Sequence, residues 1–374
     1  MSDELTHPVE REYAVRLGLF GWICLLARAI GITFSLLFKA AKAALGGSKH
    51  GHTFYRYIVG EGMRDYQYGL SAVGIQNLLP STSWTCRRFA RKNGLPHATI
   101  HLRDGTTAVR IGESQPSKAV VFFHGGGYMA PALSDHAHFA CGFAKTLPAG
   151  VAVYVLQYAL ASETANHYPR QLQQAVSLLE YVLNSEKLPP SAVTLVGDSA
   201  GGHLAISLLL HLAHPKPQVP PLPMAGRLAG AALISPWVIN ADPSKGYTDA
   251  NKNKDILYAD ALDYWARNFL GAAAPDSWTC PLITPGDWWA DIPVDDILVT
   301  YGEDELLREN ATEFVRVLQA GHARTTAVGY AGEFHVHMVM NRFLRINGEC
   351  KSEEQFRAWL RARIDTEAAG TEKQ

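Results

Sequence analysis

A short motif, GDSAG at positions 197–201, carries the residue types that nucleophilic chemistry requires. It follows the apolar run AVTLVG (192–197), which predicts a strand, and leads into SAGGHLAISLLLHLAH (199–214), which predicts a helix. A serine at this spacing between glycines sits on a sharp turn, with its hydroxyl at the helix N-terminus. The motif predicts Ser199 as the nucleophile of an acyl transfer. The alternative without catalysis is a glycine-rich turn in which the serine caps the helix.

A second glycine-rich segment, AVVFFHGGGYMA (119–130), places three consecutive glycines directly after another apolar strand. Glycines fill no core, so a purpose other than packing is indicated. Acyl transfer from an ester builds an oxyanion, which backbone N–H groups stabilise where no side chain blocks the approach. The predicted oxyanion-hole residues are Gly125, Gly126, Gly127 and Ala200; the donors are the amides of the last three, and Gly125 lets the loop bend.

A serine nucleophile also needs a histidine and an acid, which follow it in the order acid and then histidine in folds with this motif. The segment GYAGEFHVHMVM offers two histidines, and we favour His335 over His337 because the loop leaving the predicted strand reaches it first. The segment LVTYGEDELLREN offers three adjacent acids, Glu303, Asp304 and Glu305. One of these carboxylates would accept the Nδ1–H of the histidine and stabilise the imidazolium.

Two side chains next to the glycines have other expected roles. We expect His124 to order the loop by hydrogen bonding rather than to transfer protons, and Tyr128 to line the cleft as a substrate-binding residue. Trp237 is a further aromatic residue that either lines the cleft or packs in the core. An apolar cleft of this kind favours a hydrophobic ester as substrate.

The elements that must position these residues alternate between strands and helices from about residue 95 onward. The predicted strands are 119–123, 151–158, 192–197, 228–237, 296–302 and 324–330. The predicted helices are 168–184, 199–214, 306–320 and 352–364. Such alternation predicts an α/β fold with a mostly parallel central sheet and helices on both faces.

The alternation does not extend over the whole chain, because residues 1–94 precede it and an insertion interrupts it. Residues 1–94 form a predicted N-terminal hydrophobic or cap region, and residues 95–374 form the predicted catalytic domain. Within that domain a helical insertion at 251–272, with aromatic residues on one side, indicates a cap insertion at about 240–275. We expect these helices to roof a pocket.

The segment LGLFGWICLLARAIGITFSLLF (17–38) is nearly all apolar and is long enough to span a bilayer, for which ~20 residues suffice. Arg28 in its middle opposes insertion by roughly 2.5–3.5 kcal/mol. The acidic stretch before it does not resemble a secretory leader. A membrane anchor or surface-lying helix and a lid over the site remain equal alternatives. The protein is accordingly expected at a membrane, the endoplasmic reticulum included, or in the cytoplasm.

Composition excludes several other classes of function. The 374 residues carry 34 basic and 35 acidic side chains, so no basic excess indicates nucleic-acid binding. Five scattered cysteines form neither a disulfide framework nor a zinc motif, which favours a reducing compartment. The proposed chemistry requires no metal and no organic cofactor.

Five segments, HGGGY, QYALASETANHYP, GDSAGGH, YGEDELLRE and GEFHVH, resemble the hormone-sensitive lipase-like branch of the α/β-hydrolases. This branch includes arylacetamide deacetylases and steryl acetyl hydrolases. The resemblance covers roughly residues 97–364 and implies the α/β-hydrolase fold with a helical cap. It places the nucleophile on Ser199 and the histidine on His335. The acid usually heads a D-x-L-x-D run, which Glu305 heads here with Glu for Asp, and Asp304 is the second choice.

The resemblance implies a serine carboxylester hydrolase, an esterase or deacetylase, acting on a hydrophobic small-molecule ester. A short acyl group on a terpenoid, sterol or polyketide fits this expectation. One alternative is a non-hydrolytic enzyme of secondary metabolism that uses the same site for cyclisation or acyl transfer, because a fold does not fix a reaction. A less favoured alternative is a small-molecule receptor, which typically lacks the histidine that is present here.

Overall fold

The central sheet has eight strands, in the spatial order β1-β2-β4-β3-β5-β6-β7-β8. The computed structural model describes residues 12–47, 49, 53–146, 148–239, 246–345 and 350–365. The strands are β1 (His97–His101), β2 (Thr107–Gly112), β3 (Lys118–Phe123), β4 (Val151–Gln157), β5 (Val193–Asp198), β6 (Gly230–Ile234), β7 (Ile297–Gly302) and β8 (Thr325–Tyr330). Strands β1, β2 and β4 pair antiparallel, and the pairs from β4 to β8 are parallel.

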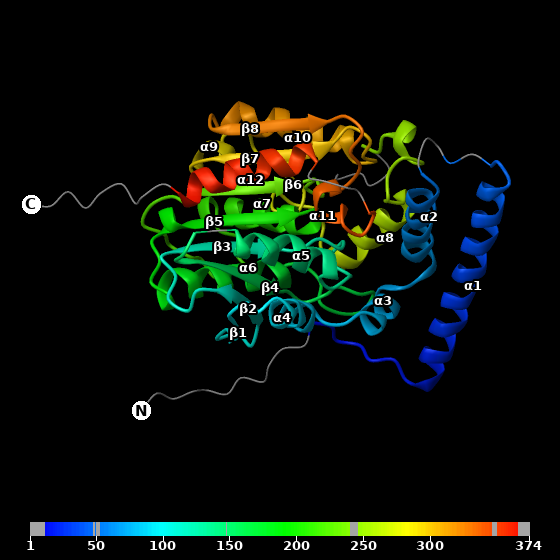
Figure 1. The fold of residues 1–374 in the computed structure, drawn as a ribbon. Coiled ribbons are helices and arrows are strands. Elements are labelled where there is room, and N and C mark those ends of the chain that lie inside the picture. The colour runs from blue at the N-terminus through cyan, green and yellow to red at the C-terminus, as the bar shows by residue number, and fades with distance from the viewer. Residues whose placement is uncertain are drawn as a thin grey trace, which may run out of the picture.

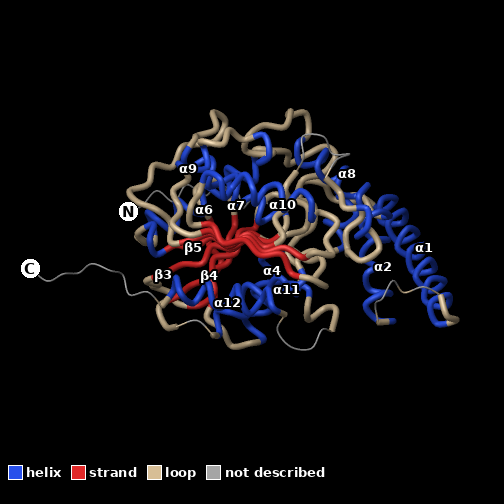
Figure 2. Tube along the Cα trace, turned by 90° about the horizontal axis from the view of Figure 1, so that it is seen from above, coloured by secondary structure: helices blue, strands red, loops and turns tan. Residues whose placement is uncertain are grey.

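Helices cover both faces of this sheet, as the sequence predicts (Figure 2). One face carries α4 (Thr82–Lys92), α5 (Ser134–Gly142), α11 (His337–Met340) and α12 (Lys351–Ile364). The other face carries α6 (Arg170–Glu180), α7 (Ala200–Ala213), α9 (Trp288–Asp291) and α10 (Arg308–Gly321). Strands β4 and β5 are buried along their whole length, which is why their sequences are continuous apolar runs.

The order of the strands creates a switch point beside β3. The chain leaves β3 toward β4 on one side and later returns to β5 on the other. In open α/β sheets, the loops after such strands diverge and leave a crevice at their carboxyl ends. The segments 124–127 and 197–201 both follow strands that end at this point.

Helix α4 of the predicted N-terminal region packs on the sheet, whereas the three helices before it lie beside the sheet (Figure 1). These are α1 (Leu19–Ala44), α2 (Phe54–Gly69) and α3 (Ala72–Leu78). Helix α2 lies between α1 and the rest of the molecule, and it packs against α8 (Ala259–Leu270). Since α1 lies on the outer side of α2, it does not form the lid over Ser199 that was one alternative.

The secondary structure differs from the sequence-based expectations in three places. The six predicted strands correspond to β3–β8, but the antiparallel strands β1 and β2 were not predicted. Strand β6 ends at Ile234, short of the predicted residue 237, because Ser235 has a positive φ of 43° and a proline follows. The predicted helix 251–272 is helical only as α8, and residues 240–245 of the expected cap insertion lie outside the described residues.

Candidate active site

Ser199 lies on the turn between β5 and α7, with φ 50° and ψ −118°, a strained backbone conformation. The two glycines of the motif make this turn possible because the backbone is crowded on both sides. A Cβ at Gly201 would overlap the carbonyl oxygen of Phe123 in β3, and a Cβ at Gly197 would overlap the backbone of Gly201. The turn therefore requires both glycines and holds Ser199 at the carboxyl edge of the sheet.

Three side chains from separate segments meet beside this turn. The Ser199 hydroxyl donates to Nε2 of His335 at 2.8 Å, and Nδ1–H of His335 donates to Oε2 of Glu305 at 3.0 Å. The side chains of His335 and Glu305 are almost fully buried, and Ser199 is 9% exposed. This line of hydroxyl, imidazole and carboxylate is the arrangement that activates a serine nucleophile.

The other candidate acids and the other histidine point elsewhere. Asp304 forms an ion pair with Lys254 at 3.0 Å, and Glu303 lies 3.8 Å from Arg308. Nδ1 of His337 accepts from the amide of Phe334 at 3.4 Å. Glu305 is thus the one of the three acids that contacts the imidazole of His335.

The environment of His335 favours its protonated form. Burial by itself lowers the pKa of His335, whereas the hydrogen bond and the charge of Glu305 raise it. The charges of Asp255 and Asp198 act in the same direction, so the pKa of His335 lies above its ordinary value. An imidazolium that forms during proton transfer is therefore stabilised in place.

The loop after β3 presents free amides next to Ser199. Gly126 and Gly127 have φ values of 111° and 60°, which glycine adopts without strain. No acceptor among the described residues takes a hydrogen bond from the amide of Gly126, Gly127 or Ala200. A Cβ at Gly127 would overlap the ring of Trp265 in α8, so α8 packs directly on this loop.

Gly125 belongs to the predicted oxyanion hole as the residue that lets the loop bend, and its amide has an acceptor within the protein. Its amide donates to Oδ1 of Asp198 at 3.0 Å and so is not free for an oxyanion. Oδ2 of Asp198 accepts from Nε2 of His136 at 3.2 Å. Asp198, the second residue of the GDSAG motif, therefore fastens the glycine loop to the turn of Ser199.

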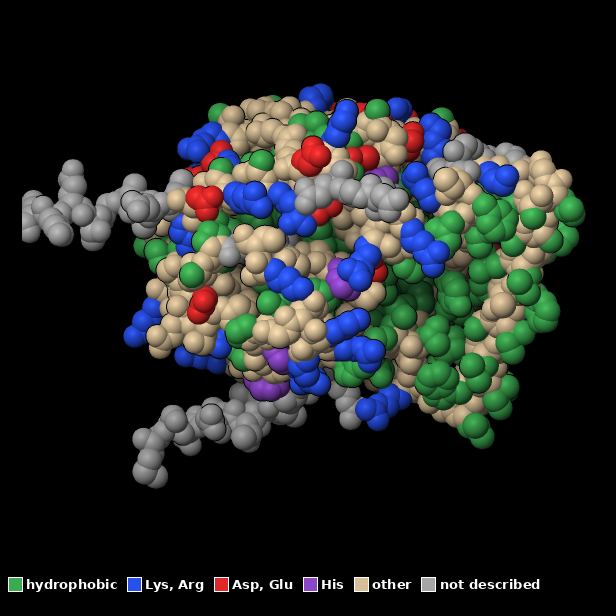
Figure 3. Space-filling model, viewed as in Figure 1, with side chains coloured by type: hydrophobic (Ala, Val, Ile, Leu, Met, Phe, Trp, Pro, Cys, Tyr) green, Lys and Arg blue, Asp and Glu red, His purple; other side chains and the backbone are tan. Residues whose placement is uncertain are grey.

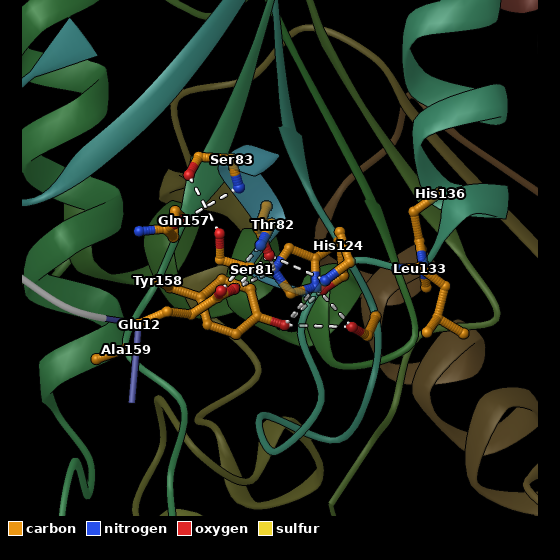
Figure 4. Close-up of polar contacts among 12 residues, drawn as sticks. Glu12, Ser81, Thr82, Ser83, His124, Leu133, His136, Gln157, Tyr158 and Ala159 are labelled. Carbon is orange, nitrogen blue, oxygen red and sulfur yellow. Dashed lines mark hydrogen bonds and ion pairs between the residues drawn. The ribbon is translucent and has the colours of Figure 1, made fainter. Parts of the chain in front are cut away.

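His124 supports the same loop through a hydrogen bond from its ring (Figure 4). Its Nδ1–H donates to the carbonyl oxygen of Gly125 at 2.7 Å, and its ring stacks on Tyr158 with centroids 4.2 Å apart. Burial lowers the pKa of His124 to about 3, so the ring is neutral. This placement agrees with the expectation that His124 orders the loop.

A carboxylate from the N-terminal region completes this buried network (Figure 4). Glu12 accepts from the amide of Thr82 at 2.9 Å and is hydrogen-bonded to the Thr82 hydroxyl, which lies 3.2 Å from Nε2 of His124. Burial raises the pKa of Glu12 to about 7. No local pattern in the chain indicates this contact, because Glu12 lies 70 residues before its partner.

Tyr128 does not line a cleft, contrary to its predicted substrate-binding role. The side chain is fully buried, its hydroxyl lies 2.7 Å from Nδ1 of His203, and its ring stacks on Phe269 with centroids 4.1 Å apart. Nε2–H of His203 donates to the carbonyl oxygen of Thr279, which leaves Nδ1 to accept from the Tyr128 hydroxyl. Trp237 is 2% exposed and belongs to the core.

Ser235 is a further residue of the site that the sequence-based analysis missed. Its hydroxyl donates to Oε1 of Glu305 at 2.6 Å and accepts from the amide of Val336 at 3.0 Å. The available signal was its position directly after β6, on the edge of the sheet where the other site residues lie. No group of three or more His, Cys, Asp or Glu side chains among the described residues is arranged to hold a metal ion.

Comparisons with known proteins agree with this architecture. The sequence model of one family, described as the alpha/beta hydrolase fold, matches residues 120–339. The chain is 28% identical to an acetyl-hydrolase of Streptomyces hygroscopicus over 59% of its length and 69% of that relative. It is 27% identical to steryl acetyl hydrolase 1 of Saccharomyces cerevisiae over 50% of its length, but the match spans only 45% of the yeast protein.

Solved structures give the same result for the fold. A hormone-sensitive lipase from a metagenome library superimposes with a TM-score of 0.66 and 21% identity, over 83% of this chain and 98% of that one. An esterase of the bacterial hormone-sensitive lipase family gives a TM-score of 0.62 and 20% identity, over 84% and 99% of the two chains.

Proposed function

Since this chain belongs to the α/β-hydrolase fold family, we propose that it is a serine carboxylic ester hydrolase acting on a hydrophobic small-molecule ester. The membership confirms the fold and the resemblance expected from the sequence. The observation that carries the proposal is the continuous hydrogen-bonded line from Ser199 through His335 to Glu305. The relatives named as acetyl hydrolases support a short acyl group.

The site performs hydrolysis in two steps. His335 takes the hydroxyl proton as Ser199 attacks the ester carbonyl, and Glu305 holds the imidazolium. The amides of Gly126, Gly127 and Ala200 stabilise the oxyanion, and the alcohol leaves with the proton from His335. Water then attacks the acyl-enzyme by the same route and releases the acid.

Hydrolysis of p-nitrophenyl esters of increasing acyl length tests the proposal. We expect the acetyl ester to be turned over, and Ser199→Ala to lose about 10⁴- to 10⁶-fold in kcat because the nucleophile is gone. The matched control is Ser114→Ala, at an exposed serine in the loop after β2. Thermal melting of both variants checks that they fold. Full turnover by Ser199→Ala would reject the proposal.

Two measurements separate hydrolysis from the alternative functions. In ¹⁸O-labelled water, a hydrolase puts the label into the acid product, whereas an enzyme that transfers the acyl group to an alcohol does not. A serine-reactive phosphonate labels Ser199 in either enzyme and does not label a receptor whose serine is not activated.

We also propose that α1 binds along the surface of a bilayer. Among the described residues, α1 is the one helix long and apolar enough to cross a membrane, by length and composition. Large apolar side chains cover its outer side (Figure 3). The exposed ones are Leu19, Phe20, Ile23, Leu26, Ile30, Phe34, Leu37 and Phe38.

The inner side of α1 supports a surface-lying helix rather than a spanning one. Lys39 forms ion pairs with Glu61 at 2.9 Å and with Asp65 at 2.5 Å, both in α2. Arg28 donates to the carbonyl oxygen of Gly69 at 3.4 Å. Because charged groups at the centre of a bilayer are costly, this face and its partner α2 favour the interface, with only the outer side in contact with lipid.

Flotation with phosphatidylcholine vesicles tests this arrangement. We expect Phe20→Ser combined with Phe34→Ser to weaken binding about 100-fold, because two exposed phenyl rings no longer enter the lipid. The matched control is Ile283→Ser with Phe343→Ser, two exposed apolar residues of the body. Extraction at alkaline pH should release the wild-type protein, and retention would indicate a spanning helix instead.

A further inference from the structure

The irregular segment between the short turn at Asp249–Asn251 and α8 carries a buried carboxylate that the proposed triad does not use. Asp255 is 1% exposed. Its Oδ1 accepts hydrogen bonds from the amides of Ile256 at 2.7 Å and His335 at 3.0 Å. Its Oδ2 accepts from the amide of Leu306 at 2.6 Å. One carboxylate thus holds three backbone amides from three segments.

Two of these amides belong to the loops that carry the triad. His335 is the base itself, and Leu306 directly follows the acid Glu305. The 3.0 Å contact between His335 and Glu305 exists only while the loops after β7 and β8 keep their relative position. Asn251 acts on the first of these loops, because its side-chain amide donates to the carbonyl oxygens of Glu303 at 2.8 Å and Glu305 at 2.9 Å.

Helix α2 holds the segment that carries Asp255. Arg64 donates to the carbonyl oxygen of Asp255, and Glu61 accepts from the same guanidinium. The side-chain amide of Gln67 donates to the carbonyl oxygen of Ile256 at 2.9 Å and accepts from the amide of Tyr258 at 3.2 Å. Contacts from α2 therefore fix the backbone at Asp255 and directly after it, and so the position of its carboxylate.

We propose that Asp255 is a positioning residue of the active site: its carboxylate fastens the Glu305 loop to the His335 loop, and its negative charge supports the His335 imidazolium. The inference rests on the proposed function, since it assigns these two loops to catalysis. It predicts a defect in proton transfer rather than in substrate binding.

The charges around Asp255 define what its removal should do. His335 and Glu305 face Asp255 from the triad side, Arg64 lies on the α2 side, and the neighbouring Lys254 is paired with Asp304. The charge of Asp198 acts on His335. Burial first, and then the charge of Glu305, raise the pKa of Asp255 to about 6, while His335 and the amides oppose them. In return the charge of Asp255 raises the pKa of His335.

Two substitutions separate geometry from charge. Asp255→Asn keeps the shape but removes the charge and turns one acceptor into a donor, and Asp255→Glu keeps the charge but displaces it. The matched control is Asp260→Asn, an exposed carboxylate in the first turn of α8. For each folded variant, the readouts are kcat and KM for p-nitrophenyl acetate and the rate of Ser199 labelling by a phosphonate across pH.

We expect Asp255→Asn to lower kcat by about 10- to 100-fold, the usual consequence of displacing catalytic groups, with KM within about twofold. The acid limb of the pH profile of this variant, where the rate falls as pH drops, should move to lower pH. The reason is that one of the charges that raise the pKa of His335 is absent. Asp255→Glu should lower kcat but keep the wild-type limb, and Asp260→Asn should match the wild type.

Three results would overturn the proposal: wild-type kcat in Asp255→Asn, an unmoved acid limb in that variant, or a loss explained wholly by the unfolded fraction in thermal melts. The labelling readout keeps the two proposals distinguishable. If the wild-type protein reacts with the phosphonate but hydrolyses no ester, the proposed function fails, and the pH dependence of labelling still decides the role of Asp255.

Discussion

Helices α1 and α7 are both rich in apolar residues, and the structure places them in opposite environments. Twelve of the 14 residues of α7 are buried, from Ala200 at its start to His211 in its last turn. Only three of the 26 residues of α1 are buried, namely Leu25, Ile32 and Ala43. Helix α7 touches β3, β5, β6 and other helices, whereas α1 packs mainly on α2.

The two helices should differ in how their residues contribute to function. Residues near the start of α7 position single atoms of the site, whereas many residues of α1 share one apolar surface. Helix α7 begins directly after Ser199, the proposed nucleophile, so its packing fixes Ser199 against His335. Helix α1 presents a broad apolar side whose members contribute separately to any lipid contact. Substitutions in the body should therefore have large, local effects, and single substitutions in α1 should have small ones.

After Ser199→Ala, the largest effect should come from Glu305→Gln, also at the carboxyl edge of the sheet. We expect a loss of about 10³- to 10⁴-fold in kcat, because the amide cannot hold the imidazolium as a carboxylate does. The matched control is Asp304→Asn, one residue away and paired with Lys254, which should stay within about threefold. Equal losses in both variants would contradict the assignment of the acid.

The pH profile of kcat/KM sharpens this assignment. Activity requires neutral His335, and its pKa is raised, so activity should fall as pH drops, with a midpoint above the ordinary value of about 6.5. Glu305→Gln removes the strongest influence that raises this pKa. Its residual activity should therefore show a midpoint at lower pH, and an unchanged midpoint would be evidence against the pairing.

Stability should separate the two helices directly. Leu208→Ala in α7 removes a fully buried side chain and should cost about 2–5 kcal/mol of unfolding free energy. Leu26→Ala in α1, where the side chain is 53% exposed, should change it by less than about 0.5 kcal/mol. Urea denaturation of the two variants measures both values, and similar losses would show that α1 has a core contact in solution.

Glu12 is a point where the N-terminal segment touches the body, and it should make stability depend on pH. Its pKa in the folded state is about 7, against an ordinary value near 4.5, so the folded protein binds more protons than the unfolded chain between these values. Its contribution to the unfolding free energy should fall as pH rises through this range. Relative to Glu12→Gln, the free energy of unfolding of the wild type should fall by about 1–3 kcal/mol between pH 5 and pH 8. A constant difference between the two proteins would contradict this burial.

A single substitution on the outer side of α1 should have the smallest effect. Leu37→Ala should weaken vesicle binding only about threefold to tenfold, because one partly inserted side chain is shortened. Turnover of a soluble ester should not change. A large loss of turnover would show that α1 acts on the catalytic site.

The elements with local signals could be predicted from the chain before its structure was known. Alternating apolar strands and helical patterns predicted β3–β8 and the helices on both faces, and GDSAG placed Ser199 between a strand and a helix. The HGGG segment predicted the loop with free amides, because only glycine permits that backbone. These signals are visible in one segment, since they reflect backbone geometry and apolar periodicity.

Which side chains meet became clear only from the folded chain. Asp304 and Glu305 are adjacent in the sequence, and the choice between them depends on which one turns toward His335, 30 residues later. Tyr128 is adjacent to the glycines yet packs on Phe269, and Asp255 and Glu12 reach their partners across 80 and 70 residues. Such contacts arise when burial of the common core brings separate segments together. A local sequence pattern therefore does not indicate them.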